Sequence, residues 1–316
     1  MGELMSLQPL LLITVGISVG ILAGAMPGVS PSMGVALMVP FTYAMDPPMA
    51  LVYLAAIYLA ANYGGAITAI MINTPGTPSA VVTSFDGHPL CVQGRAREAL
   101  GLALVASFVG GAVGTVVLML FASPLASVAL KFWPAEYFSL AVLGLSTIAS
   151  MGGENALKSA ISAAFGLLIC TVGMDPVLGV SRFTFGNVNL FDGFEFIPML
   201  IGLLALSEIF VEVEGFDFRA QRVEDDTGSK WPGFLYYWKY RAAMMRASII
   251  GTIVGIFPGA GATIAAFISY DMEKKISKTP EKFGTGLPEG VIAGEAADSA
   301  SVGGALVPML TLGIPG

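Results

Sequence analysis

The sequence contains few of the residues on which most enzymes and disulfide-bonded scaffolds depend. It has two cysteines and one histidine, and charged residues make up only 12% of its 316 residues. The cysteines, Cys91 and Cys170, are too few for a disulfide framework or a metal site, and we read both as structural. The HExxH zinc motif, the GxxxxGK[ST] phosphate loop and the GxGD motif of intramembrane aspartyl proteases are absent. These absences argue against zinc-dependent proteolysis and ATP hydrolysis.

A serine–histidine pair is the remaining enzymatic arrangement, and it would have to use His88. That residue lies in Asp86–Pro89, an Asp-Gly-His-Pro segment typical of a turn between two apolar runs. We therefore expect His88 to lie in a loop and not in a catalytic dyad.

Apolar residues dominate the composition. They make up 55% of the chain, and the mean hydropathy of +0.78 is well above that of an ordinary soluble domain. Uncharged stretches such as Ala99–Ala122 reach the roughly 20 residues that a membrane-spanning helix needs. The 39 glycines and 19 prolines suit a bundle with closely packed and broken helices. The sequence therefore predicts an all-α polytopic membrane protein.

Two motifs occur twice in the chain, in the same order and at a nearly constant offset. Gly20–Gly28 recurs as Gly251–Gly259, and Gly64–Gly76 recurs as Gly303–Gly316. Ordered recurrence indicates a duplication, which is the sequence signature of inverted-repeat secondary transporters with helical hairpins and broken helices. We expect a first transmembrane repeat at 1–211, a cytoplasmic linker at 212–241 and the truncated start of a second, inverted repeat at 242–316.

The distribution of basic residues predicts the orientation of the two halves. The hairpin around Pro27–Ser32 has no Lys or Arg on its flanks, whereas the hairpin around Pro258–Thr263 has basic residues on both sides. By the positive-inside rule the two hairpins enter from opposite faces. Threading the remaining spans places every basic residue except Lys131 and Arg182 in the cytoplasm, and an aromatic cluster at 231–238 then suits the membrane interface. These remaining spans are expected at 49–73, 99–122, 137–151, 156–173 and 194–211.

Hydroxyl- and amide-rich breaks interrupt the apolar runs at 27–32, 73–79 and 258–263. A helix that begins after such a break directs free N–H groups and its positive dipole end at the gap, which suits a carboxylate. The alternative is that the breaks only permit kinks and close packing. The candidate substrate-binding residues are Gly28, Ser30, Ser32, Asn73, Thr74, Gly76, Thr77, Gly259, Gly261 and Thr263.

Two acidic residues, Glu295 and Asp298, are three positions apart and therefore share one helix face. Ionisable groups within apolar helices are costly and usually functional, so we take both, with Ser301, as candidates for coupling to a cation. The alternative is a solvated helix end. No cofactor is expected other than a coupling Na⁺ or H⁺.

These motifs resemble the large membrane subunit, TctA, of the tripartite tricarboxylate transporter family. The resemblance implies a multi-pass permease of the bacterial inner membrane that takes up citrate-like or other carboxylates with a cation gradient. It also implies two partners, a small membrane subunit and a periplasmic solute-binding protein. The chain departs from the family at Asp298-Ser299, where asparagines are usual. The resemblance rests on Gly24–Gly28, Tyr63–Gly65, Asn73–Pro78, Asp86-Gly87 with Gly94, Pro258–Gly261, Glu289-Gly290, Glu295 and Gly303–Gly316.

Two other functions remain open at this point, a solute or ion channel and, less favoured, an intramembrane enzyme. A complete second repeat would bring the length to roughly 480 residues. We therefore expect this chain to be a fragment of the transporter.

Overall fold

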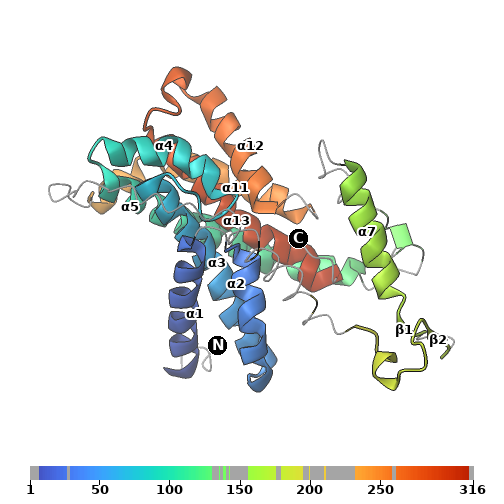
Figure 1. Cartoon of the computed structure of the whole chain (residues 1–316). Helices are drawn as coiled ribbons and strands as arrows, with labels where there is room; N and C mark the ends of the chain where they lie inside the picture. Colours follow the sequence, from blue (N-terminus) through green and yellow to red (C-terminus); the bar gives the residue numbers. More distant parts are fainter. Residues whose placement is uncertain are drawn as a thin grey trace.

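A computed structural model describes residues 7–26, 29–129, 156–175, 179–194, 232–257 and 261–312, with a few isolated residues between them. This part of the chain is helical apart from one short antiparallel hairpin, which confirms the all-α fold class (Figure 1). The helices are α1 (Leu7–Ala25), α2 (Pro31–Met38), η2 (Val39–Ala44), α3 (Pro47–Ile72), α4 (Ala80–Val92), α5 (Ala96–Ala129), α7 (Ala156–Cys170), η4 (Val188–Leu190), α10 (Phe234–Trp238), α11 (Arg241–Ile256), α12 (Gly261–Ile276), η6 (Pro280–Lys282) and α13 (Pro288–Leu312).

The described helices follow the predicted segmentation closely. Two of them, Pro47–Ile72 and Ala96–Pro124, are long and apolar enough to cross a membrane. Helix α7 matches the span predicted at 156–173, whereas the spans at 137–151 and 194–211 lie outside the described residues, apart from isolated positions. Helices α1 and α2 are separated by a short break, as are α11 and α12, and a long helix follows each pair. The order agrees with the repeated motifs; the inversion of one half relative to the other stays a prediction.

Helix α13 lies at the centre of the bundle and contacts α5, α11, α12, α4 and α3 (Figure 1). Small residues permit these close contacts. A Cβ atom at Gly110 of α5 would overlap the backbone of Ala296 on α13, and one at Gly251 of α11 would overlap that of Ala297. Helix α13 is therefore held between two neighbours that leave it little room to slide or rotate.

The turn predicted at Asp86–Pro89 is wrong, because α4 runs through it and includes Pro89. Asp, Gly, His and Pro favour turns locally, but tertiary contacts decide the conformation here. The Asp86 carboxylate binds residues of the loop before α13, and Gly87 packs against Ile70. His88 consequently lies in a helix, where its Nδ1 is 3.0 Å from the carbonyl oxygen of Ile70.

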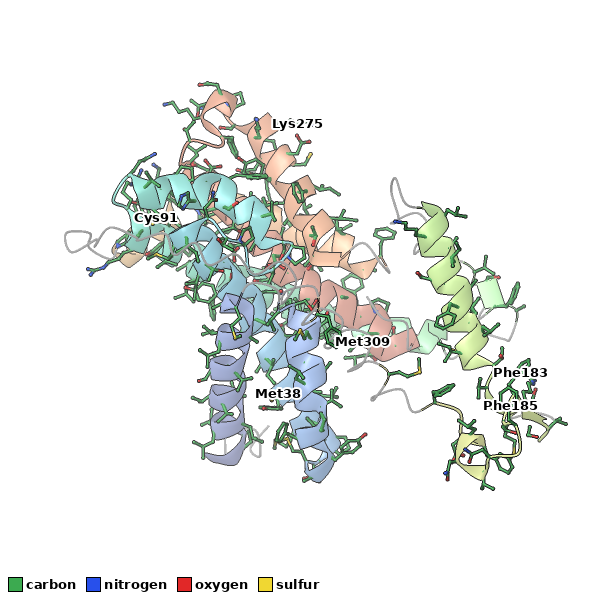
Figure 2. The ribbon with its side chains drawn as sticks, in the orientation of Figure 1. Met38, Cys91, Phe183, Phe185, Lys275 and Met309 are labelled. Carbon is green, nitrogen blue, oxygen red and sulfur yellow. The ribbon has the colours of Figure 1, made fainter. Side chains whose placement is uncertain are left out.

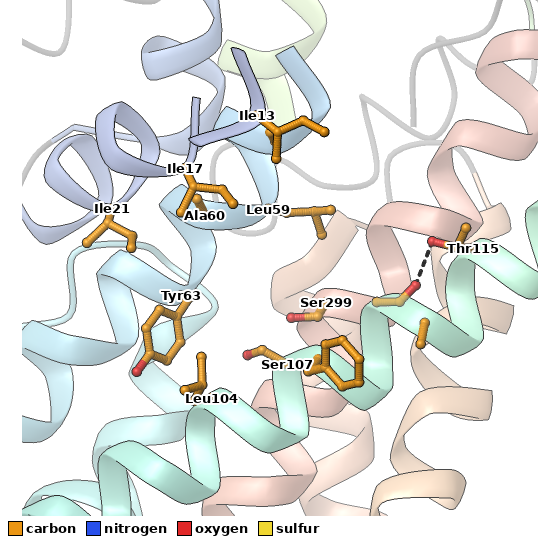
Figure 3. Close-up of a pocket in the computed structure, with 14 residues that line it drawn as sticks. Ile13, Ile17, Ile21, Leu59, Ala60, Tyr63, Leu104, Ser107, Thr115 and Ser299 are labelled. Atoms are coloured by element: carbon orange, nitrogen blue, oxygen red, sulfur yellow. Dashed lines mark hydrogen bonds between the residues drawn. The ribbon is translucent and has the colours of Figure 1, made fainter. Parts of the chain in front are cut away.

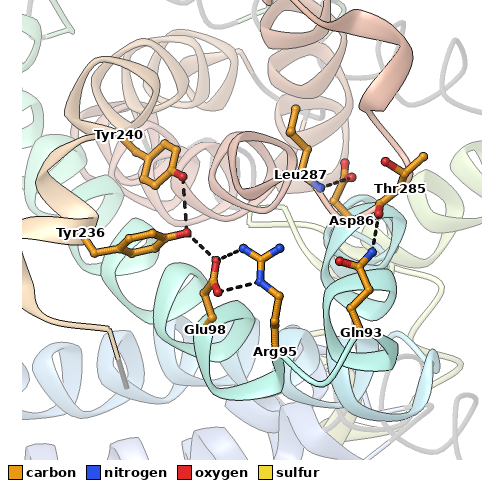
Figure 4. A network of polar contacts seen from close by, with 8 residues as sticks. All are labelled: Asp86, Gln93, Arg95, Glu98, Tyr236, Tyr240, Thr285 and Leu287. Carbon is orange, nitrogen blue, oxygen red and sulfur yellow. Dashed lines mark hydrogen bonds and ion pairs between the residues drawn. The ribbon is translucent and has the colours of Figure 1, made fainter. Parts of the chain in front are cut away.

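The aromatic cluster at the end of the linker was expected to form an interfacial belt or an amphipathic segment, and its placement in a membrane stays a prediction. Tyr237 and Tyr240 are buried in the core, while Trp238 is exposed. Figure 4 shows Glu98 between Arg95 and Tyr236, from which it accepts hydrogen bonds. Burial, followed by the hydrogen bond to Glu98, raises the pKa of the Tyr236 hydroxyl, so the hydroxyl remains a donor. The end of the linker is thus tied to the start of α5.

The short hairpin consists of β1 (Gly173–Met174) and β2 (Ser181–Arg182) and lies to one side with α7 (Figure 1). An ion pair between Arg182 and the buried Asp175 holds it. Phe183 and Phe185 follow it and are 60% and 90% exposed (Figure 2).

Candidate functional site

A row of oxygen-bearing side chains joins α4 to α13. Ser79, at the start of α4, donates a hydrogen bond from Oγ to Oδ2 of Asp298 at 2.9 Å. One turn along, the Thr83 hydroxyl donates to Oε1 of Glu295. Residues 79, 83 and 86 share one helix face by their spacing, so a single face of α4 meets both predicted cation-coupling carboxylates and, at Asp86, the loop before α13.

Asp86 forms the outer end of this row and fixes the start of α13. Its Oδ1 accepts backbone N–H bonds from Gly284, Gly286 and Leu287 at 2.9, 2.9 and 2.7 Å, the last of which is drawn in Figure 4. Its Oδ2 accepts the Tyr270 hydroxyl at 2.8 Å. A carboxylate that accepts several N–H bonds beside a helix N-terminus is in a favourable position. Asp86 therefore sets the start of the helix that carries Glu295 and Asp298.

Two glycines of α13 let α4 come close enough for these bonds to form. A Cβ atom at Gly290 would overlap the Asp86 carboxylate, and one at Gly294 would lie 3.2 Å from Oγ1 of Thr83. Gly65 allows a similarly close approach on α3, because a Cβ at this position would lie 2.6 Å from the Thr77 side chain. Small residues thus bring α3, α4 and α13 together around the polar row.

The two carboxylates are deeply buried and have hydroxyl groups as their recorded hydrogen-bond partners. Glu295 and Asp298 are each 1% exposed in the interior of α13. Oε2 of Glu295 accepts the Ser107 hydroxyl of α5 at 3.0 Å. Oδ1 of Asp298 has no hydrogen-bond partner in the part of the chain that the structure describes. The alternative of a solvated helix end does not fit this burial.

No ion pair of the described residues involves either carboxylate. The described ion pairs join Arg95 to Glu98, Arg182 to Asp175, Arg246 to Glu273, and Lys275 to Asp271. Burying an ionised carboxylate without a positive partner is expensive. Carboxylate and hydroxyl oxygens are also the kind of ligand that a hard cation prefers.

The break after α3 lies against this cluster, but its residues differ in exposure. Thr77 is 2% exposed, and its Oγ1 lies 3.2 Å from Oγ of Ser79, where either hydroxyl can donate. Gly76 is buried, whereas Asn73 and Thr74 are exposed. Asn73 ends α3 with a φ of 53°, and the Thr74 hydroxyl bonds the carbonyl of Ile72. Thr77 is thus the predicted substrate-binding residue whose side chain joins the cluster.

The other predicted substrate-binding residues lie at the two hairpin breaks. Ser30 caps α2 by accepting the N–H of Met33, and Ser32 is exposed. Gly261, with a φ of +63°, begins α12, and Thr263 is half-buried in its first turn. No hydrogen bond within the described ranges joins these residues to the cluster.

Three further predicted positions complete the set. Gly28 and Gly259 lie outside the described residues. The Ser301 hydroxyl bonds the backbone oxygen of Asp298 at 2.7 Å, within its own helix. Its cation-coupling role stays a prediction.

Thr83 and Ser107 are site residues that sequence reasoning missed. Each bonds a carboxylate of α13 from a distant segment of the chain, separated by 212 and 188 positions. The i, i+4 spacing of Ser79 and Thr83 could have indicated that both lie on one helix face. The turn predicted at Asp86–Pro89 argued against a helix there, so this spacing was not used.

A cavity of about 450 Å³ adjoins the cluster between α1, α3, α5 and α13. Its walls are mainly apolar, as at Ile17 and Leu104. Figure 3 shows Ser107 and Ser299 next to each other at one wall, and Ser107 is the residue that donates to Glu295. The cavity therefore reaches a side chain that is hydrogen-bonded to Glu295.

Comparisons with known proteins show which family the sequence resembles. A model of the family described as "Tripartite tricarboxylate transporter TctA family" matches residues 10–316. An "Uncharacterized 52.8 kDa protein in TAR-I ttuC' 3'region" of Agrobacterium vitis is 41% identical over 281 residues, which cover 89% of this chain and 56% of that protein. An "Uncharacterized protein in TAR-II ttuC' 3'region" of the same organism is 46% identical over 65 residues, or 21% of this chain and 27% of the relative. The chain thus spans about half or less of the curated relatives it matches, and no solved structure matches it.

Proposed function

This chain belongs to the tripartite tricarboxylate transporter TctA family, and from that membership we propose that it is the large permease subunit of a cation-coupled carboxylate uptake system. In this proposal it is a multi-pass protein of a bacterial inner membrane. It works with a small membrane subunit and with a periplasmic solute-binding protein that delivers the carboxylate.

The observation that carries the proposal is the buried carboxylate pair beside a broken helix. Glu295 and Asp298 are 1% exposed, and hydroxyl groups are their recorded partners. Ionisable residues in membrane bundles are retained for function because they are costly. Transporter sites occur where helices are interrupted, and the break between α3 and α4 supplies that interruption here.

The break also offers main-chain donors for an anion. Among the described residues, no recorded backbone hydrogen bond uses the N–H of Thr77 or Ser79 as its donor. These donors precede the N-terminus of α4, where the helix dipole favours negative charge. A carboxylate held there needs no buried Arg or Lys.

The proximity of anion donors and carboxylates gives a reason for coupling. A substrate carboxylate about 4 Å from one ionised side chain experiences a repulsion of about 4 kcal/mol at an effective dielectric constant of about 20. A Na⁺ or H⁺ bound at Glu295 and Asp298 removes this repulsion. The cation and the substrate therefore bind as a pair, which is the requirement for symport.

Counterflow in proteoliposomes that contain the complete transporter tests the proposal. Vesicles loaded with unlabelled citrate, succinate or acetate receive the same labelled compound outside, with and without inward Na⁺ or pH gradients. A carrier accelerates exchange, and the gradient of its coupling ion drives accumulation. Labelled uptake without accelerated exchange identifies a channel and contradicts the proposal.

A further inference from the structure

Among the residues that the structure describes, one buried polar atom on α3 and one on α13 lack hydrogen-bond partners, and their needs are complementary. Oδ1 of Asp298 is an acceptor without a donor, and Nδ2 of Asn62 is a donor without an acceptor. Asn62 is 2% exposed and Asp298 is 1% exposed, so bulk water does not satisfy them. Buried polar groups in folded proteins are normally paired, so each unpaired one calls for an explanation such as a bound water, ion or ligand.

Helical spacing places Asn62 on the face of α3 that meets the carboxylate cluster. Gly65, three residues later, packs directly on Thr77. Thr77 lies within hydrogen-bond distance of Ser79, which in turn donates to Asp298, and α3 also contacts α13. Residues at i and i+3 line one face of a helix. Asn62 therefore lies on the face of α3 that packs on Thr77, towards the residues that are bonded to Asp298.

We propose that Asn62 and Asp298 are adjoining halves of one site that binds a carboxylate substrate together with its coupling cation. The Asn62 amide donates a hydrogen bond to a carboxylate oxygen, and Oδ1 of Asp298 binds the cation. The inference rests on the proposed transport function and names the group that recognises the substrate on α3. A cation–carboxylate pair supplies the acceptor and the positive charge that the two buried atoms lack.

The neutrality of Asn62 is essential to this assignment. A Lys or Arg at the same position would pair with Asp298 and would remove the need for a bound cation. An amide donates to an anion without neutralising the neighbouring carboxylate. The negative charge of Asp298 therefore stays unbalanced until a cation binds. This couples substrate binding to the cation.

Direct binding to the purified complete transporter tests the proposal. Labelled acetate, succinate and citrate are first screened with wild type at saturating NaCl and, separately, at low pH without Na⁺, which distinguishes the two cations. If none of these carboxylates binds under either condition, the proposed transport function fails, and this inference fails with it.

The variants Asn62→Ala and Asn62→Leu are then compared with wild type for the carboxylate that binds. Both variants remove the donor, and Leu also keeps the number of side-chain heavy atoms. Loss of one hydrogen bond to a charged group is expected to raise the carboxylate Kd about tenfold to a hundredfold. Cation binding without carboxylate, measured as 22Na⁺ binding or as proton uptake, should stay within about twofold of wild type.

Ser269→Ala provides a matched control, because Ser269 Oγ on α12 is another buried atom for which the described residues supply no partner. It should leave both affinities unchanged. If wild type binds a carboxylate and a folded Asn62 variant has the same carboxylate Kd, the assignment of Asn62 is wrong while the transport function stands. An Asn62 variant that loses both affinities equally also contradicts it, since the residue then acts through packing.

Discussion

Replacement of Asp86 should destabilise the protein more than replacement of any exposed acidic residue. Asp86 is fully buried, and its carboxylate accepts three backbone N–H bonds and the Tyr270 hydroxyl. Asp86→Ala leaves these donors without an acceptor. Each unpaired buried donor costs about 1 to 3 kcal/mol, and because losses at one carboxylate are not additive, we expect a total of about 3 to 5 kcal/mol.

A series of variants separates the contributions of the Asp86 charge and of its hydrogen bonds to stability. Asp86→Asn keeps one oxygen for the backbone N–H groups but loses the charge, so we expect a loss of about 1.5 kcal/mol. Tyr270→Phe removes one hydroxyl donor and should cost about 1 kcal/mol. Asp271→Ala is the matched control, because its side chain is 58% exposed and pairs with Lys275 on the surface; it should change stability by less than about 0.5 kcal/mol.

Equilibrium denaturation of the purified complete protein in micelles measures these differences, with tryptophan fluorescence and circular dichroism as independent signals. The expected order of destabilisation is Asp86→Ala, then Asp86→Asn, then Tyr270→Phe, then Asp271→Ala. If Asp86→Ala and Asp271→Ala unfold at the same denaturant concentration, the bonds between Asp86 and the start of α13 contribute nothing to stability.

Two further predictions concern the break and the packing of α13. Thr77→Ala should raise the half-saturation concentration for carboxylate uptake about tenfold to a hundredfold, because a hydroxyl next to the anion donors is lost; Gly76→Val should raise it further, and an unchanged value for both would leave the break as a packing kink. Gly110→Ala should lower thermal stability because its Cβ overlaps the backbone of Ala296, whereas Gly111→Ala, with nothing within 4 Å, should not; equal melting temperatures of the two variants would contradict the close packing of α5 on α13.

The helices of this bundle were largely predictable because apolar runs and Pro-Gly breaks mark their ends. The spans predicted at 49–73 and 99–122 correspond to α3 and α5. The helix α4 was not predictable in this way, since Asp86–Pro89 has the local preferences of a turn. Its helical conformation depends on contacts between Asp86 and residues 270–287, which no local pattern contains.

The candidate site was also only partly predictable, because local spacing identifies some of its residues and long-range contacts supply the others. The three-residue spacing of Glu295 and Asp298 placed both on one face of a helix, and their burial agrees with a functional pair. Their partners Thr83 and Ser107 come from helices far away in the sequence. Asn62 is one polar residue in a long apolar run, and no local pattern shows that its face of α3 packs on Thr77.

The most direct test of the account is the ratio of cation flux to carboxylate flux in proteoliposomes that contain the complete transporter. In wild type, a carboxylate gradient should drive Na⁺ or H⁺ inward at a fixed ratio, as coupling requires. Asp298→Asn and Glu295→Gln keep the shape of each side chain but remove its charge, so the number of cations moved per carboxylate should fall in one or both variants. An unchanged ratio in both variants, together with normal uptake, would show that the buried carboxylates do not couple transport to a cation.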